Sequence, residues 1–246
     1  MKLHFLGTTG YHANDMRQTA CLMMPEIGVI LDAGTGIYRA RDLVQTDQLH
    51  IFLTHTHLDH VVGLTFFYSV FAEQNTKIII HMDERKISAV KDYLFHPDLF
   101  PIRPDFEFVP FDDQPVKLVD GSKLSTIPLE HPGGSLGFRI DWPERSFAYI
   151  TDTTASLDAD YVQKIQGVDT LVHECNFPDG FEDTCKLTGH SSLTPVAKVA
   201  AKVGAGKVYL VHINPVEKIG AMIDCDAVKS IFENMEIASD HQIINV

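Results

Sequence analysis

The sequence has few basic residues and no long apolar run. Its 246 residues include 20 Lys and Arg against 33 Asp and Glu, which gives a formal net charge of −13. Proteins that hold nucleic acid by its backbone usually carry basic patches, so this balance opposes such a function, although bound divalent cations would reverse the sign locally. No segment reaches the roughly 18 apolar residues of a membrane-spanning helix, and the first residues do not resemble a signal peptide. We therefore expect a soluble, cytoplasmic protein.

Cysteine is also scarce, and its spacing indicates no structural bridge. Cys21, Cys175, Cys185 and Cys225 form no CxxC pair, so the sequence implies neither a disulfide framework nor a zinc knot. Reduced thiols agree with a cytoplasmic location. Low-complexity and proline-rich linkers are absent as well, and a chain of this length can fold as one α/β unit. We predict a single domain spanning residues 1–246.

Short apolar runs separated by turns predict strands along most of the chain. The expected strands are 2–6, 20–24, 28–31, 51–54, 77–81, 123–129, 136–141, 145–150, 170–173 and 207–212. Apolar residues at three- and four-residue spacing predict helices at 61–71, 83–93, 157–165 and 193–203. Two mixed sheets flanked by helices account for this order, which indicates the α/β class.

Glycine and proline mark the expected turns. We expect the glycines at 34, 36, 133 and 134 to adopt positive φ and to let the backbone approach a site. Residues 95–104 contain three prolines, which remove hydrogen-bond donors from a strand. We predict a surface loop there, one that can wall a pocket.

The residues from 55 to 60 place four potential metal ligands in six positions: His55, His57, Asp59 and His60. Alternating residues on an extended segment point the same way, so His55 and His57 can share one metal ion while Asp59 and His60 face a second. Imidazole and carboxylate groups suit zinc, manganese or iron. A polar loop whose histidines only form hydrogen bonds is the alternative. The density of ligands favours the metal site.

Further histidine and aspartate residues follow strand-like runs. His131, Asp152 and His212 each come at the C-terminal end of an apolar run, where a sheet edge can present them to a common cleft. Asp32 ends another such run. Each residue alone would more commonly be a capping or core residue, but their common placement favours one site.

These motifs together resemble those of metallo-β-lactamase-fold hydrolases and, within that superfamily, of RNase Z-like phosphodiesterases. They run in family order: LDAGTG, HTHLDH, EHPGG, ITDTT and YLVHINP. The segments LVHEC and TGHSS are similar to the HEAT and HST loops of the RNase Z group, with Cys175 and Ser192 as the departures. The resemblance spans nearly the whole chain. It implies a four-layer αββα sandwich of two mixed β-sheets flanked by helices.

The resemblance also implies a role for each motif residue. Asp32 would orient ligand imidazoles or the HTHLDH loop through hydrogen bonds. Asp59 would accept a proton from a bridging water, and His190, kept cationic by Glu174, would protonate the leaving alkoxide. Two divalent ions would lower the pKa of that water toward neutrality, with zinc as the first expectation and manganese or iron as alternatives. The implied ligands are His55, His57 and His131 for one ion, Asp59, His60 and His212 for the other, and Asp152 bridging both.

The implied activity is that of a metal-dependent hydrolase, a dinuclear phosphodiesterase that uses metal-bound hydroxide. RNase Z holds its tRNA with a protruding arm, which many members insert between the positions of His131 and Asp152. Only residues 132–151 lie there in this chain, enough for one tight strand pair. We therefore expect no arm, and a small phosphodiester or nucleotide as the substrate.

Three alternatives remain open. The first is an RNase Z-type tRNA 3′-endonuclease without the usual arm, so RNA stays a candidate partner. The second is a lactone or thioester hydrolase, since the same hydroxide attacks carbonyl groups, although such relatives usually lack the Glu174 and His190 loops. The third is a non-catalytic metal-binding accessory protein. The resemblance also allows a homodimer, and nothing in the sequence calls for a membrane partner.

Overall fold

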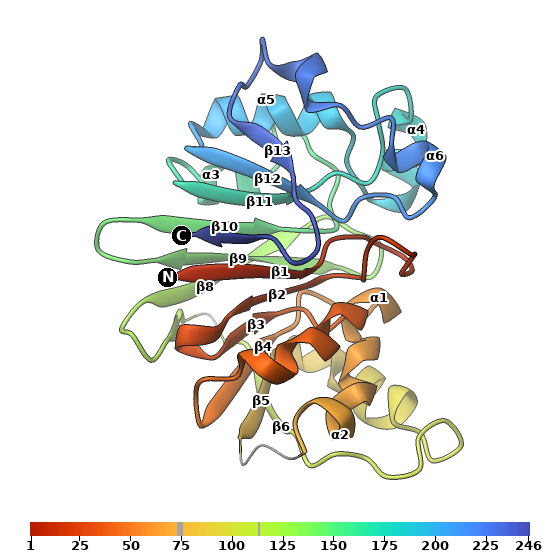
Figure 1. Cartoon of the computed structure of the whole chain (residues 1–246). Coiled ribbons are helices and arrows are strands. Elements are labelled where there is room, and N and C mark those ends of the chain that lie inside the picture. Colours follow the sequence, from red (N-terminus) through yellow and green to blue (C-terminus); the bar gives the residue numbers. More distant parts are fainter. Residues whose placement is uncertain (73–75, 113) are drawn as a thin grey trace. The chain divides into compact units, whose positions relative to one another are not determined.

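Two β-sheets organise the chain, one in each of two units. The computed structural model describes residues 1–72, 76–112 and 114–246. Figure 1 shows α1 and α2 beside the sheet of unit 1, and α3 and α5 beside the sheet of unit 2. The expectation of two mixed sheets flanked by helices is confirmed, whereas the single domain over residues 1–246 stays a prediction. Unit 1 comprises Met1–Gln114 and Asp240–Asn245, and unit 2 comprises Pro115–Ser239 and Val246.

The sheet of unit 1 has seven strands among the described residues, in the order β14-β1-β2-β3-β4-β5-β6. The strands β3 to β6 are parallel to one another, whereas β1 pairs antiparallel with both β2 and β14. The last strand of the chain therefore lies beside the first. The bounds are β1 Lys2–Gly7, β2 Cys21–Met24, β3 Val29–Leu31, β4 Gln48–Phe52, β5 Lys77–Met82, β6 Glu107–Pro110 and β14 Ile243–Asn245.

The helical elements of unit 1 share a buried cluster with one face of its sheet. Ile51 of β4 and Ile80 of β5 pack in this cluster with Leu64 of η3, because alternate side chains of a strand point to the same face. Burial of each such side chain contributes about 1.5–3 kcal/mol. The elements are α1 Leu58–Val61, α2 Phe67–Val70, the 3₁₀ helices η1 Pro25–Ile27, η2 Thr35–Leu43, η3 Val62–Phe66 and η4 Glu84–Lys86, and the π-helical η5 Ala89–Leu94.

The expected helix over 61–71 is divided between α1, η3 and α2. Gly63 explains the interruption. A Cβ atom at this position would lie 2.1 Å from the Gly34 backbone oxygen, and the Gly63 amide donates to the Ala33 carbonyl at 2.8 Å. The backbone is thus held against the neighbouring loop by tertiary bonds, which replace the regular hydrogen bonds of one long helix.

The sheet of unit 2 also has seven strands among its described residues, in the order β13-β12-β11-β10-β9-β8-β7. The strands β10 to β13 are parallel, and β7 to β10 pair antiparallel. The bounds are β7 Val116–Lys117, β8 Lys123–Leu129, β9 Ser135–Asp141, β10 Ser146–Ile150, β11 Thr170–Glu174, β12 Lys207–Val211 and β13 Met235–Ile237. The helices are α3 Tyr161–Lys164, α4 Glu182–Thr188, α5 Leu193–Val203, α6 Glu217–Gly220 and the 3₁₀ helix η6 Cys225–Val228.

Helix α5 begins and ends at the predicted residues. Its apolar positions, among them Leu193, Val196, Ala200 and Val203, join the buried cluster of unit 2 at helical spacing. Gly204 ends the helix with a left-handed φ of 65° and donates its amide back to the last turn. The expectation of α-helix over 193–203 is therefore confirmed.

Several further expectations concern loops and cysteines. The proline-containing segment 95–104 lies in an irregular connection between η5 and β6, as predicted. Gly133 and Gly134 adopt positive φ as expected. The expectation was wrong for Gly34, which has a φ of −70°, and for Gly36, which lies within η2 without a positive φ. Both glycines still let the backbone approach closely, since a Cβ at Gly34 would lie 2.3 Å from the Asp59 carbonyl oxygen and one at Gly36 would lie 2.6 Å from the Leu6 carbonyl oxygen. All four cysteines are free. Among the helices that the structure describes, none has the length and apolar character that crossing a membrane requires.

A buried carboxylate fixes the C-terminal segment of unit 1. Asp240 accepts hydrogen bonds from the Thr8 amide at 3.0 Å, from the Thr8 hydroxyl at 2.7 Å and from the Gln18 amide at 2.7 Å, and it pairs with Arg39. The side chains of Asp240 and Arg39 are only 4% and 13% exposed. Removal of one partner from such a pair leaves a poorly solvated charge.

We expect Asp240→Ala to lower the free energy of unfolding by about 3–5 kcal/mol, measured by urea denaturation. Asp226→Ala is the matched control, because Asp226 also pairs with a cation, Lys229, but is 75% exposed. The free energy of unfolding of Asp226→Ala should fall by less than about 1 kcal/mol. Equal losses in the two variants would contradict the role given to Asp240.

Candidate metal centre

The HTHLDH motif continues from β4 into α1 in unit 1. His55 and His57 lie on the extended connection, and Asp59 and His60 lie in the helix. The His55 ring centroid is 4.4 Å from that of His57 and 4.2 Å from that of His60. His55 and His60 are buried, Asp59 is half-buried and His57 is exposed. The structure thus brings the three imidazoles of the motif together.

Asp32, which directly follows β3, forms hydrogen bonds to His60 of this motif and to Thr54, which precedes the motif. Its Oδ1 accepts from the Thr54 amide at 2.8 Å, and its Oδ2 accepts from His60 Nδ1 at 2.9 Å. Thr54 also donates its hydroxyl to the same carboxylate at 2.9 Å. Asp32 and His60 are fully buried. Their hydrogen bond fixes the imidazole plane and leaves Nε2 of His60, which faces Asp59, for a ligand.

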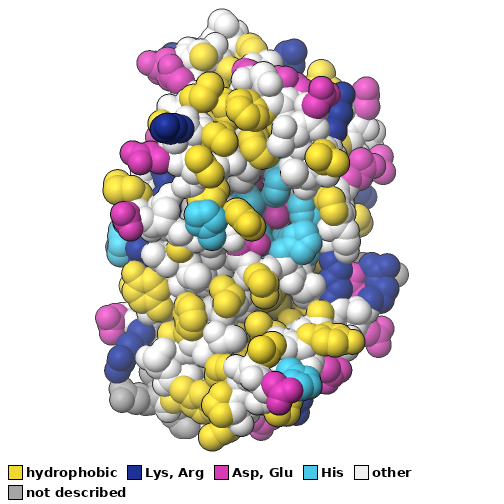
Figure 2. All heavy atoms as spheres, turned by 90° about the vertical axis from the view of Figure 1, so that its right-hand side faces the viewer, with side chains coloured by type: hydrophobic (Ala, Val, Ile, Leu, Met, Phe, Trp, Pro, Cys, Tyr) yellow, Lys and Arg dark blue, Asp and Glu magenta, His cyan; other side chains and the backbone are white. Residues whose placement is uncertain are grey.

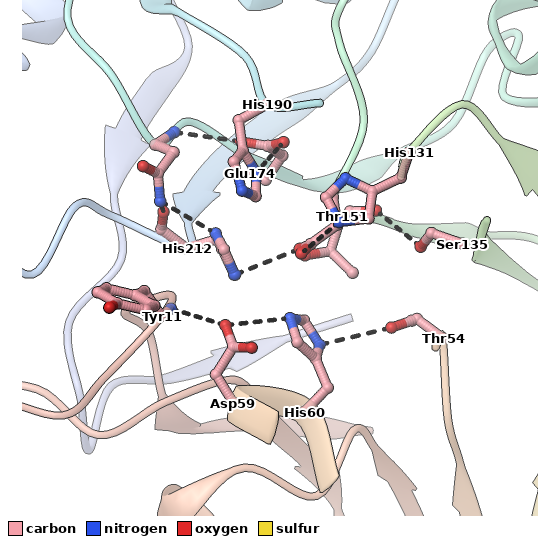
Figure 3. A network of polar contacts seen from close by, with 12 residues as sticks. Tyr11, Thr54, Asp59, His60, His131, Ser135, Thr151, Glu174, His190 and His212 are labelled. Atoms are coloured by element: carbon pink, nitrogen blue, oxygen red, sulfur yellow. Dashed lines mark hydrogen bonds and ion pairs between the residues drawn. The ribbon is translucent and has the colours of Figure 1, made fainter. Parts of the chain in front are cut away.

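Asp59 is oriented in the same way. Its Oδ2 accepts from the Tyr11 backbone amide at 2.6 Å and lies 3.5 Å from His60 Nε2 (Figure 3). Tyr11 lies in the glycine-containing turn after β1 and has a positive φ of 61°. The N-terminal turn therefore fixes the carboxylate of the motif.

In unit 2, the predicted residues follow the ends of neighbouring strands. Asp152 follows β10, Glu174 ends β11 and His212 follows β12. Since these three strands are parallel, their C-terminal ends meet at one edge of the sheet. His131 follows β8, which runs in the same direction because β9 pairs antiparallel with both β8 and β10.

Asp152 lies between two imidazoles. Its Oδ2 is 3.6 Å from His131 Nε2, and its Oδ1 is 3.3 Å from His212 Nε2. Both distances exceed those of ordinary N–H···O hydrogen bonds. The two oxygens of one carboxylate thus point toward two different nitrogen ligands, which is the arrangement a bridging carboxylate needs.

The remaining contacts of His131 and His212 hold their rings. His131 Nδ1 donates to the Gly189 carbonyl at 2.9 Å. The Asn176 amide group lies 3.2 Å from His212 Nδ1 and donates to the His212 carbonyl at 2.9 Å. Burial lowers the pKa of His131 below its ordinary value, while the charge of Asp152 acts in the opposite direction.

Glu174 and His190 form the second predicted pair. His190 Nδ1 lies 3.1 Å from Glu174 Oε1. Glu174 is fully buried, and its carboxylate accepts from the backbone amides of Thr153 at 3.0 Å, Asn176 at 3.2 Å and Ser191 at 3.2 Å. These donors stabilise a buried negative charge, and that charge orients the half-buried His190 ring (Figure 3).

Three site residues occupy a backbone conformation that is unusual for side-chain-bearing residues. Asp32, Asp152 and His212 have φ values of 59°, 51° and 55°. Such left-handed residues cost energy and concentrate at functional sites. Each follows a buried strand, so the turn after the strand directs the side chain out of the sheet edge.

The donor atoms fit a bound cation. Because a carbonyl oxygen only accepts, His131 must carry its proton on Nδ1, and neutral His131 then presents an Nε2 lone pair to Asp152. His60 likewise donates Nδ1 to Asp32 and turns Nε2 toward Asp59. In both pairs an Nε2 lone pair faces a carboxylate oxygen, and two such acceptors repel each other unless a cation binds between them. Ligand atoms of Asp152, His190 and His212 also come within 4.8 Å of one another.

Contact residues such as Thr54, Asn176 and Gly189 were missed from the sequence. Thr54 directly precedes the HTHLDH motif, and Asn176 and Gly189 flank the predicted Glu174 and His190, so proximity to a motif is the one signal that could have found them. Gly189 has a φ of 73°, and a Cβ there would lie 2.7 Å from His131 Nδ1. Several histidine side chains are open to the outside on the face drawn in Figure 2.

Comparisons with known proteins show the family to which the chain belongs. The family model described as "Beta-lactamase superfamily domain" matches residues 28–213. Ribonuclease Z of Haloarcula marismortui is 24% identical, with 87% of this chain and 86% of the relative covered. Ribonuclease Z of Exiguobacterium sibiricum is 22% identical, with 99% of both chains covered.

Solved structures share the fold. The metallo-β-lactamase fold protein YhfI from Bacillus subtilis superposes with a TM-score of 0.80 at 17% identity, covering 99% of this chain and 98% of that one. The short form of human tRNase Z gives 0.75 at 19% identity, covering 100% and 99%. A diphosphatase of the PhnP family gives 0.72 at 18% identity, covering 100% and 97%.

Proposed function

Since the chain belongs to the beta-lactamase superfamily, we propose that it is a metal-dependent hydrolase, namely a dinuclear phosphodiesterase that acts on a small phosphodiester or nucleotide. The observation that carries this function is the Asp152 carboxylate, whose two oxygens face the Nε2 atoms of His131 and His212. The pair of buried Glu174 and half-buried His190 supplies an acid–base group. Two relatives bear the name ribonuclease Z, which denotes action on RNA, a polymer joined by phosphodiester bonds, and this name supports the same bond class.

We keep the ligand assignment that the motifs and the family resemblance imply. Bound divalent cations would supply Lewis-acid stabilisation of phosphoryl oxygens and a more acidic water. Zinc is our first assignment, with manganese or iron as alternatives that the same donors accept. The free cysteines support a reducing, cytoplasmic location, and a homodimer remains the expectation from the family. The proposed ligands are His55, His57 and His131 for one ion, Asp59, His60 and His212 for the other, and Asp152 for both.

Two side chains of this chain carry out the proton transfers, Asp59 as the base and His190 as the acid. Asp59, held by the Tyr11 amide, accepts the proton of the attacking water. His190 stabilises the phosphoryl oxygens and gives its proton to the departing oxygen, while Glu174 retains the positive charge on the ring. Asp32 acts only through His60 and Thr54, and so positions ligands without touching substrate.

The short connection between β9 and β10 supports a small substrate. The two strands pair from Asp141 with Ser146 onward, and only residues 142–145 connect them. A substrate-holding arm at this place is therefore excluded, as the sequence predicted. The net charge of −13 further disfavours a long polyanion, and Lys and Arg lie interspersed with Asp and Glu on the face drawn in Figure 2. A small phosphodiester fits these features best.

RNA cleavage is the second candidate. It is favoured by the relatives named ribonuclease Z, which cover nearly the whole chain. An armless enzyme would have to hold RNA by other surfaces.

A substrate panel tests the proposed function. Protein reconstituted with zinc or manganese should hydrolyse bis(p-nitrophenyl) phosphate and cyclic nucleotides, and should leave lactones and thioesters intact. Turnover of lactones without turnover of phosphodiesters would overturn the phosphodiesterase assignment. Cleavage of a tRNA precursor in preference to every small phosphodiester would favour the second candidate.

A further inference from the structure

A cavity of about 520 Å³ lies wholly within unit 2. Its described lining comes from the end of β8 and the residue that follows, from the loop after Asp152 and from α3. None of the proposed metal ligands is among these lining residues. The volume falls within the roughly 300–1,000 Å³ that is typical of small-molecule pockets. The proposed phosphodiesterase function gives this cavity no role.

Buried residues form the floor of the cavity. Ile127, Leu129 and Tyr161 line it and also belong to the buried cluster of unit 2. The fourth buried residue of the described lining, Thr153, is 1% exposed. Because three of these four side chains are largely apolar, the apolar part of a ligand gains burial when it lies on this floor.

Hydrogen bonds hold the polar groups of the floor in place. The Thr153 amide donates to Glu174 Oε1 at 3.0 Å, and the Thr153 carbonyl accepts from the Ser191 hydroxyl at 2.7 Å. His173 Nδ1 donates to the Glu174 carbonyl at 2.7 Å, so His173 Nε2 accepts from the Tyr161 hydroxyl at 3.0 Å. The floor is therefore preformed, and a charged group of a ligand must find its partner at the mouth of the cavity.

The mouth of the cavity is acidic. Glu130, Asp158 and Asp160 are exposed there, and Lys164 is the one basic residue of the described lining. Three negative charges against one positive charge leave a net charge of −2. Within the part of the chain that the structure describes, the three carboxylates form no ion pair. Exposed acidic groups alone are common, but here they surround the opening above an apolar floor.

We propose that this cavity is a binding site for a small organic cation, an amine with an apolar or aromatic body. The body lies on the floor, and the ammonium group lies among the carboxylates of the mouth, where a nearby protein surface strengthens their attraction. The same carboxylates repel an anion, so this site differs in ligand class from the metal centre, whose proposed substrate is an anionic phosphodiester. Binding here does not require the proposed hydrolysis and is measured without turnover.

Two probes of similar shape and different charge test this site. Isothermal titration calorimetry at pH 7 should show that 2-phenylethylamine binds the wild type about tenfold more tightly than 2-phenylethanol, the factor that corresponds to about 1.4 kcal/mol. Benzyltrimethylammonium should bind as the amine does. This third probe has no lone pair that could coordinate a metal ion, so its binding does not arise from ligation in the metal centre.

The double variant Asp158→Asn with Asp160→Asn should lose the preference through weaker binding of the amine, with the Kd of the alcohol unchanged within about twofold. Glu144→Gln with Glu233→Gln is the matched control, because it removes two negative charges from exposed residues of unit 2 that do not line the cavity. This control should keep the full preference. Ala159→Trp fills the cavity from a half-buried lining position and should remove binding of all three probes.

Equal Kd values of amine and alcohol in the wild type would overturn this site, as would the absence of amine binding. Equal losses in the aspartate variant and in the glutamate control would attribute the preference to the overall charge of the chain and overturn it too. Binding of benzyltrimethylammonium that persists in a folded Ala159→Trp variant would place the cation outside this cavity.

Discussion

Replacement of Asp152 should abolish turnover and lower the metal content together. Its two carboxylate oxygens face His131 Nε2 and His212 Nε2, so one substitution removes a ligand from both proposed ions. Loss of partners that merely support metal ligands typically costs about 10–100-fold. We therefore expect Asp152→Asn to reduce kcat by more than about a hundredfold and to leave fewer than two ions per chain.

Asparagine is the better replacement at this position for a conformational reason. Asp152 has a φ of 51°, and asparagine tolerates the left-handed region better than alanine does. Asp158→Asn, on the exposed loop that follows, is the control and should keep activity and metal. Full activity of Asp152→Asn with two bound ions would contradict a bridging role.

Replacement of His190 should separate chemistry from metal binding. The Glu174 carboxylate holds Nδ1 of this imidazole at 3.1 Å, which leaves the other ring nitrogen for substrate. A general acid contributes about 10²–10⁴ in rate. We expect His190→Ala to lower kcat by this factor for a substrate with an alkyl leaving group, while both ions stay bound.

The leaving group provides the internal control for His190. A p-nitrophenolate departs without protonation at neutral pH, so His190→Ala should lose much less with bis(p-nitrophenyl) phosphate than with an alkyl diester. The structure also allows a competing role, because ligand atoms of His190, Asp152 and His212 lie within 4.8 Å of one another. Loss of one ion in His190→Ala would show that this histidine is a ligand and not the acid.

Most strands could be predicted because buried strands are continuous apolar runs. All ten expected strands have counterparts, from β1 to β5 and from β8 to β12. The bounds of the strands β6, β7, β13 and β14 were not predicted. Each has only two to four residues, most of them half-buried or exposed, so no apolar run marks them. The pairing of β14 with β1 joins the two ends of the sequence, which no local pattern encodes.

Helices were predictable only where one whole face is buried. Helix α5 met this condition. Helix α4 did not meet this condition, because Cys185 is its one buried residue. A single buried position gives the sequence no helical periodicity. The expected helices at 61–71, 83–93 and 157–165 formed only short pieces. At 61–71 the reason is that tertiary contacts such as that of Gly63 with Gly34 outweigh helix propensity.

The site residues could be named from their motifs, but their contacts could not. The HTHLDH spacing already indicates a metal site through local geometry. The contacts of Asn176 with His212 and of Gly189 with His131 depend on the parallel pairing of β11 with β12 and on the loop after α4. The left-handed backbone of Asp32, Asp152 and His212 is likewise imposed by the turns that follow their strands.

Metal content of the purified wild-type chain, measured by inductively coupled plasma mass spectrometry after reconstitution with zinc or manganese, tests the central claim most directly. Two ions per chain are expected, since donor atoms face one another at His60 with Asp59 and on both sides of Asp152. A chain that binds no ion under either condition would contradict the metal centre and the hydrolase built on it.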